Sequence, residues 1–181
     1  TSSPGNRGFS LDLDPDTHQL VVGEPGNDLT HRYVFNSGTK TWSGPMNSYM
    51  PGDSHASHNM GWSVAMRDEA VIAGSPSWAT GSTSSRGAVY AFSNGVQRQK
   101  IQKTSAQNSD QFGRKVMMQK YSGNSRIIFI ASKGVSETGD SSIGKTTGQG
   151  VVDVYYVSNY QSGQYSKTTQ IPVSYTHLTL P

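Results

Sequence analysis

Residues 61–92 contain three short apolar runs separated by polar turns: Gly61-Trp62-Ser63-Val64, Val71-Ile72-Ala73-Gly74-Ser75-Pro76 and Ala88-Val89-Tyr90-Ala91-Phe92. The runs are rich in β-branched and aromatic residues, and Gly, Pro, Asp and Ser bound them. This composition is typical of β-strands joined by turns. The link Arg67-Asp68-Glu69 is short enough for a hairpin turn between the first two strands. The stretch therefore predicts an antiparallel sheet.

The same order of runs occurs three times along the chain. The glycines that open the units, Gly8, Gly61 and Gly113, are 53 and 52 residues apart. Counterparts of the second run are Leu20-Val21-Val22-Gly23-Glu24-Pro25 and Ile127-Ile128-Phe129-Ile130-Ala131-Ser132. Counterparts of the third run are Arg32-Tyr33-Val34-Phe35 and Val151-Val152-Asp153-Val154-Tyr155-Tyr156-Val157. Each unit closes with a weaker fourth run. The chain therefore contains an internal repeat, and each repeat unit is expected to have four strands.

Four antiparallel strands in about 50 residues is the arrangement of a propeller blade. We therefore expect an all-β fold, a partial β-propeller of about three blades, with units at 8–58, 59–108 and 109–172 and no helix of three turns or more. In the first strand, Phe9, Leu11 and Leu13 alternate with polar residues, which predicts that the apolar side chains are buried. The predicted core is Val64, Val71, Ile72, Val89 and Tyr90 with their counterparts Leu11, Val21, Val22, Val34, Val116, Ile128 and Val154.

Two of these motifs carry a family resemblance. Phe112-Gly113 and Gly74-Ser75-Pro76 are similar to the two halves of the FG-GAP repeat, found in integrin-alpha-type propellers. Gly23-Glu24-Pro25 departs from the pattern by one residue, and Ala131-Ser132-Lys133-Gly134 matches it poorly. The resemblance implies a ring of about seven blades. Three blades cannot close such a ring, so it also implies a fragment. The tail at 173–181 belongs to no unit and resembles translated adaptor sequence, the alternative being an ordinary closing strand.

Composition narrows the function classes. The net charge of +3 is small and scattered, which does not favour nucleic acid. The chain has no Cys, which excludes thiol catalysis and zinc knuckles. No apolar stretch is long enough to span a membrane.

Three motifs could carry ligand chemistry. Residues 139–146 match the text of a phosphate-binding loop, but the run continues into the strand at 151–157 instead of a helix, so we expect no nucleotide binding. Asp12, Asp14 and Asp16 are candidate calcium ligands, but they lack the glycine and final carboxylate of a calcium loop, so we expect at most weak calcium. His55 and His58 could pair on a metal, and surface histidines are the alternative.

Loops at one rim of a propeller usually form its binding face. Trp78 is the most informative residue there, since no strand pattern buries it and exposed aromatics anchor protein or sugar ligands. The alternative is that Trp78 folds back over its blade. The candidate ligand-binding residues on this rim are Asp28, His31, Asp53, His55, Trp78, Arg86 and Asp110.

The function expected from this resemblance is non-catalytic. The fragment would belong to an extracellular or cell-surface propeller that binds a protein or glycan ligand in an adhesion-like role. One alternative is a propeller appended to a secreted or membrane-attached hydrolase, with the active site outside these residues. Another is a structural spacer.

Overall fold

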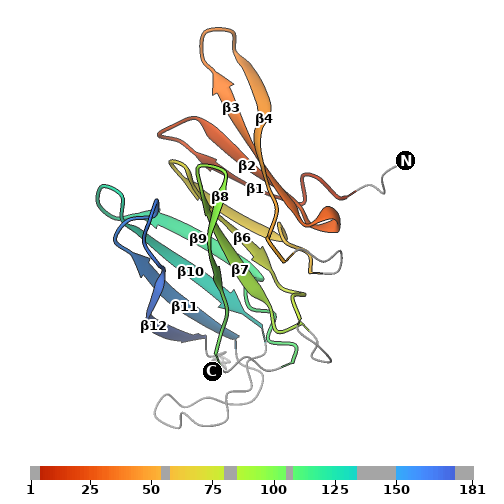
Figure 1. Cartoon of the computed structure of the whole chain (residues 1–181), viewed down its shortest axis with the longest axis vertical. Helices are drawn as coiled ribbons and strands as arrows, with labels where there is room; N and C mark the ends of the chain where they lie inside the picture. Colours follow the sequence, from red (N-terminus) through yellow and green to blue (C-terminus); the bar gives the residue numbers. More distant parts are fainter. Residues whose placement is uncertain (1–4, 54–57, 80–84, 105–107, 134–149, 174–181) are drawn as a thin grey trace, which may run out of the picture.

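The computed structural model describes residues 5–53, 58–79, 85–104, 108–133 and 150–173. These residues form three four-stranded antiparallel sheets in chain order (Figure 1), which confirms the all-β prediction. The first sheet comprises β1 (Ser10–Asp14), β2 (Gln19–Glu24), β3 (Leu29–Asn36) and β4 (Thr41–Tyr49). The second comprises β5 (Ser63–Arg67), β6 (Ala70–Ser75), β7 (Ala88–Ser93) and β8 (Val96–Ile101). The third comprises β9 (Lys115–Lys120), β10 (Arg126–Ser132), β11 (Gly150–Val157) and β12 (Ser166–Val173).

Helical structure in the described part of the chain is limited to one 3-10 turn, η1 (Pro25–Asn27). Each sheet lies within one expected unit, except that β12 extends through Val173, the first residue of the expected tail. Residues 174–181 lie outside the described residues.

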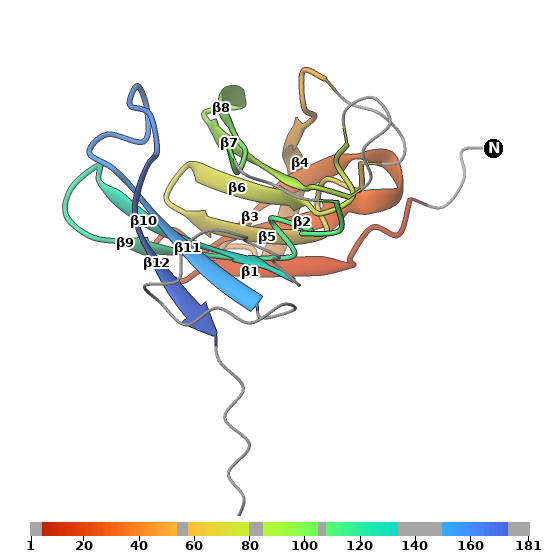
Figure 2. The same cartoon turned by 90° about the horizontal axis from the view of Figure 1, so that it is seen from below.

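The sheets pack face to face, with β1, β5 and β9 next to one another (Figure 2). One apolar cluster joins the first and second sheets and includes Val21, Val64, Val71 and Tyr90. A second cluster joins the second and third sheets. The middle sheet is covered on both sides, and all residues of β6 and β7 are buried.

We call β1, β5 and β9, the first strand of each sheet, the inner strands. The backbone turn that precedes each inner strand has the same conformation in all three units. A left-handed residue (Asn6, Asn59 or Gln111) accepts, through its carbonyl, a hydrogen bond from the backbone N–H three residues later. The glycine between them has φ of 93°, 91° and 89° at Gly8, Gly61 and Gly113, a range that side chains rarely adopt. The pairing of the third and fourth strands also shifts register at equivalent positions in all three sheets. The structure thus contains the internal repeat that the sequence predicts.

The core prediction is correct for nine of its twelve residues, which are all buried. Val22 and Val34 are half-buried. The prediction of burial is wrong for Leu11, which is 66% exposed. It is also wrong for Phe9 and Leu13 in the same strand, which are each 48% exposed. The orientation of β1 is the reverse of the prediction, because Ser10, Asp12 and Asp14 face the second sheet. Leu11 and Leu13 lie on the outer face of the first sheet, which no other described sheet covers, whereas the Phe9 ring lies against Trp62 of the second unit.

Candidate functional site

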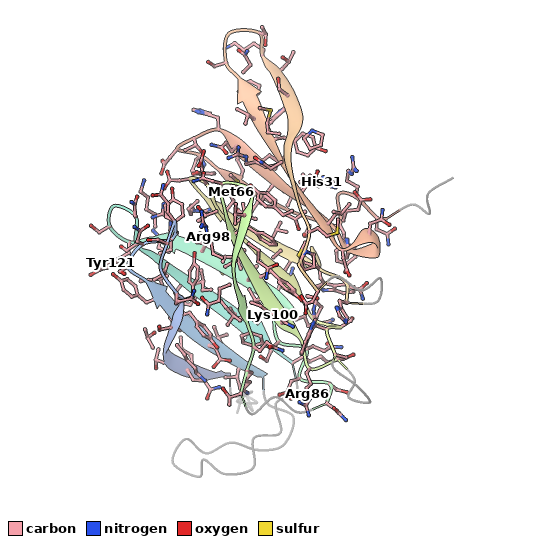
Figure 3. The ribbon with its side chains drawn as sticks, in the orientation of Figure 1. His31, Met66, Arg86, Arg98, Lys100 and Tyr121 are labelled. Atoms are coloured by element: carbon pink, nitrogen blue, oxygen red, sulfur yellow. The ribbon has the colours of Figure 1, made fainter. Side chains whose placement is uncertain are left out.

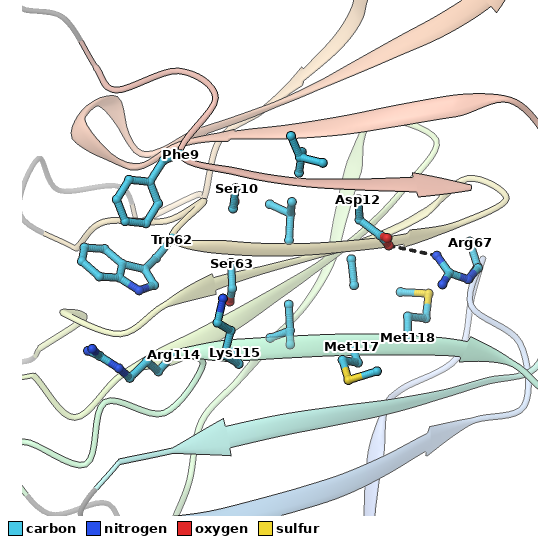
Figure 4. Close-up of a pocket in the computed structure, with 14 residues that line it drawn as sticks. Phe9, Ser10, Asp12, Trp62, Ser63, Arg67, Arg114, Lys115, Met117 and Met118 are labelled. Atoms are coloured by element: carbon cyan, nitrogen blue, oxygen red, sulfur yellow. Dashed lines mark hydrogen bonds and ion pairs between the residues drawn. The ribbon is translucent and has the colours of Figure 1, made fainter. Parts of the chain in front are cut away.

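The three inner strands form a groove, which we call the inner-strand groove (Figure 4). It encloses about 590 Å³. Its lining comes from residues 9–12 of the first unit, 62–65 and 67 of the second, and 114–118 of the third. Equivalent positions of the three units therefore meet in one concave surface.

One end of the groove carries a ladder of large side chains, Phe9, Trp62 and Arg114. Each directly follows the repeated glycine, so the repeated turn places all three at the same level of the stack. The ring centroids of Phe9 and Trp62 lie 4.6 Å apart at 48°, and the Arg114 guanidinium lies 5.9 Å from the Trp62 ring. Phe9 is exposed, while Trp62 and Arg114 are half-buried. The ladder offers a ligand an accessible aromatic edge beside a cation.

The groove carries excess positive charge. At its far end Arg67 donates to Asp12 across 2.9 Å, so these two charges compensate each other. Arg114 donates to the neutral Gln111 amide oxygen at 2.8 Å, and Lys115 is exposed. Within the described part of the chain neither Arg114 nor Lys115 forms an ion pair, which leaves two cations for an anionic ligand.

The candidate calcium ligands have other partners. The Asp14 carboxylate is buried and accepts from Asp16 N at 3.2 Å, Thr17 Oγ1 at 2.6 Å and Asp68 N at 2.6 Å. Asp12 accepts from Arg67, and Asp16 is exposed. Among the residues described, no group of three His, Cys, Asp or Glu side chains gathers in a way that could hold a metal ion. Asp12 and Asp14 instead connect β1 to the second sheet.

Trp78 is buried, with 7% exposed, so the alternative in which it folds back over its blade is the one observed. Its Nε1 donates to Asp53 at 3.2 Å, and the same carboxylate accepts from Tyr90 at 2.9 Å and Lys100 at 2.5 Å. Figure 3 labels Lys100 on β8. Its ammonium also lies 3.6 Å from the centre of the Trp78 ring. Burial raises the pKa of Asp53, but these three hydrogen bonds outweigh it and hold the pKa below its ordinary value. Lys100, which the sequence did not single out, thus covers the predicted anchor.

The remaining rim candidates do not join this cluster as one accessible site. Asp28 is buried and accepts from Met60 N at 2.8 Å. His31 is buried too, with Nε2 2.8 Å from Glu24 and Nδ1 2.9 Å from Ser48. Two further candidates contribute backbone carbonyls: Arg86 accepts from Phe112 N, and the buried Asp110 accepts from Lys133 N. His55 and residues 139–146, which match the sequence pattern of a phosphate-binding loop, lie outside the described residues.

No helix in the described residues is long and apolar enough to cross a bilayer. Comparison of the chain with protein-family models gives no matching family, and comparison with curated proteins gives no match.

Proposed function

We propose that this chain is a non-catalytic, extracellular binding module that engages an anionic segment of a macromolecular ligand in the inner-strand groove. In this proposal the three sheets are blades of an incomplete β-propeller of the FG-GAP type. The extracellular setting rests on the resemblance of the repeats, and the binding surface rests on the groove.

The observation that carries the proposal is the ladder of Phe9, Trp62 and Arg114 at the mouth of the groove. Burial of aromatic rings and contacts to arginine dominate many binding interfaces. These three side chains come from three separate units, yet the Trp62 ring lies 4.6 Å from the Phe9 ring and 5.9 Å from the Arg114 guanidinium, and Phe9 remains exposed. The rim cluster around Trp78 is less suited, because Asp53 and Lys100 already occupy that ring's polar and cationic contacts.

The uncompensated cations favour carboxylate or sulfate groups on the ligand. Opposite charges within the Debye length attract, and salt screens this attraction. Stacking on Phe9 and Trp62 adds a contribution that depends little on salt. Binding should therefore weaken, but not vanish, as ionic strength rises.

The test measures binding of two probes, a sulfated oligosaccharide and a polyglutamate peptide of matched charge, by calorimetry. Trp62→Ala and Arg114→Gln should each weaken binding of the preferred probe about tenfold, corresponding to about 1.4 kcal/mol. Trp42→Ala and Lys40→Gln are the matched controls, since both residues are exposed on the β3–β4 hairpin and neither lines the groove. The probe bound more tightly identifies the ligand as glycan or protein.

Two results would contradict the proposal. One is equal binding of both probes by the wild type, Trp62→Ala and Arg114→Gln proteins. The other is an equal loss in the Trp42→Ala control, which would place the contact outside the groove.

A further inference from the structure

Both interfaces between sheets contain the same polar contact. Ser10 Oγ on β1 donates to the carbonyl of Gly61 at 2.8 Å. Ser63 Oγ on β5 donates to the carbonyl of Gly113, also at 2.8 Å. Each serine thus holds the repeated glycine that opens the next unit.

A glycine lies opposite each of these serines in the same sheet. Ser10 pairs with Gly23, and Ser63 pairs with Gly74. A Cβ at Gly23 would lie 2.0 Å from the Gly61 oxygen, and a Cβ at Gly74 would lie 2.0 Å from the Gly113 oxygen. Only glycine leaves room for the incoming carbonyl. We call the paired serine and glycine the Ser–Gly seat.

The outer face of the third sheet has no such seat. The register that pairs Ser10 with Gly23 and Ser63 with Gly74 pairs Lys115 with Ala131 in the third sheet. The Ala131 Cβ occupies the position where the other two sheets admit a carbonyl oxygen. Lys115 also cannot act as the short hydroxyl donor. The stack therefore cannot continue beyond β9–β12 through the same contact.

The outer face of the first sheet has the opposite property. Gly8 has the same φ as Gly61 and Gly113, and its N–H donates to the Gly23 carbonyl as theirs donate to Gly74 and Ala131. A Cβ at Gly61 would lie 2.6 Å from the Leu29 oxygen of the preceding sheet, whereas one at Gly8 would meet no heavy atom within 4 Å.

The side chains on this face fit the same contact. The exposed Leu11 and Leu13 occupy the positions that Val64 and Met66 occupy in β5, and Val116 and Met118 in β9. All four of these counterparts are buried against a preceding sheet. The outer face of β1–β4 is thus built like the two faces that the structure shows covered.

From this continuity we infer that the outer face of β1–β4 is a docking surface for a four-stranded antiparallel sheet of the same repeat that carries a Ser–Gly seat. The third sheet of another copy does not qualify, because Lys115 and Ala131 replace the seat. Copies of this chain are therefore prevented from stacking head to tail on one another.

The test introduces a Ser–Gly seat into the third sheet of a donor protein. It then measures whether the β1–β4 face of an acceptor protein binds that sheet. A donor protein carries Lys115→Ser and Ala131→Gly, with Leu11→Arg added to block its own β1–β4 face. The acceptor is the wild-type chain. We expect each protein alone to sediment as a monomer, and their mixture to form a 1:1 complex with twice the mass of the chain. An acceptor with Leu11→Arg should form no complex.

The inference is overturned if the folded donor and the wild type do not associate, or if the wild type alone forms head-to-tail oligomers. Association of the wild type with a Leu11→Arg protein that lacks the seat substitutions would also overturn it.

Far-UV circular dichroism confirms that the donor is folded. If the Lys115→Ser change prevents folding, a donor with Ala131→Gly and Leu11→Arg is used, which removes only the obstructing Cβ. Association is measured without ligand, so its outcome is separate from the outcome of the ligand-binding test of the proposed function.

Discussion

Substitution of Gly74 by Ala tests the packing between the second and third sheets. Gly74 lies on β6, and its Cα faces the Gly113 backbone of the next unit. The new Cβ would lie 2.0 Å from the Gly113 carbonyl oxygen and 2.5 Å from Ser63 Oγ. One obstacle is backbone and cannot rotate away, so the sheets themselves must move.

The cost follows from these distances. Ordinary contact begins at 3.4 Å, so the two sheets must separate locally by about 1.4 Å. Such overpacking costs about 1–3 kcal/mol, and separation also breaks the hydrogen bond from Ser63 to Gly113, which contributes about 1 kcal/mol. We expect a loss of about 3 kcal/mol. For a domain of this size, that lowers the melting temperature by about 6–12 °C.

Thermal unfolding followed by circular dichroism measures the effect. Gly52→Ala is the matched control, because its Cβ would meet only the Gln97 side chain at 3.8 Å and should change stability by less than about 0.5 kcal/mol. Ala131→Gly is a second comparison at the equivalent position of the third sheet, with an expected loss of only about 0.5–1 kcal/mol from chain entropy. A melting temperature for Gly74→Ala that equals the Gly52→Ala value would refute the packing argument.

Two further predictions concern charged groups. Burial raises the pKa of Glu24, but hydrogen bonds from Arg7, His31 and Asn27 outweigh it and hold the pKa below its ordinary value of 4.5. The stability that Glu24 contributes is therefore present above about pH 4.5 and is lost as the pH falls through the lower folded value, so Glu24→Gln should flatten the dependence of the urea midpoint on pH in that range. Asp68→Asn should cost about 3 kcal/mol in urea unfolding, because it removes the carboxylate that pairs with the fully buried guanidinium of Arg126. A loss below about 0.5 kcal/mol would mean that the backbone carbonyls that accept from Arg126 stabilise its buried charge without Asp68.

The sequence predicted the strands and their repetition because both depend on local patterns. The apolar runs at 71–76 and 88–92 predicted strands, and β6 and β7 form there with every residue buried. The side of β1 that is covered depends on which neighbouring sheet is present, and alternation alone does not supply that. Asp14 shows the same limit. Its burial depends on a donor at Asp68, 54 residues away, which no local pattern contains.

The candidate site was less predictable than the fold. The sequence showed a glycine that opens each unit, at Gly8, Gly61 and Gly113, and these glycines marked the repeat. That the Trp62 ring lies next to both Phe9 and Arg114 follows only from the stacking of the three inner strands. For Trp78, the polar neighbours left two alternatives open, an exposed ring and a ring folded back over its blade, and the second is the one observed. Lys100, the residue that covers Trp78, comes from β8, whereas Trp78 lies between β6 and β7.

The middle sheet, covered on both sides, has a consequence for the order of folding. Every sheet is made of consecutive strands, so its backbone pairing closes short loops and can form early. The contacts between sheets join positions about 50 residues apart and form later. During synthesis the first sheet can be complete before the third has emerged. The middle sheet is made second, yet it reaches its final packing only when β9–β12 arrives. Until then its apolar face toward the third sheet remains open to solvent and to wrong partners.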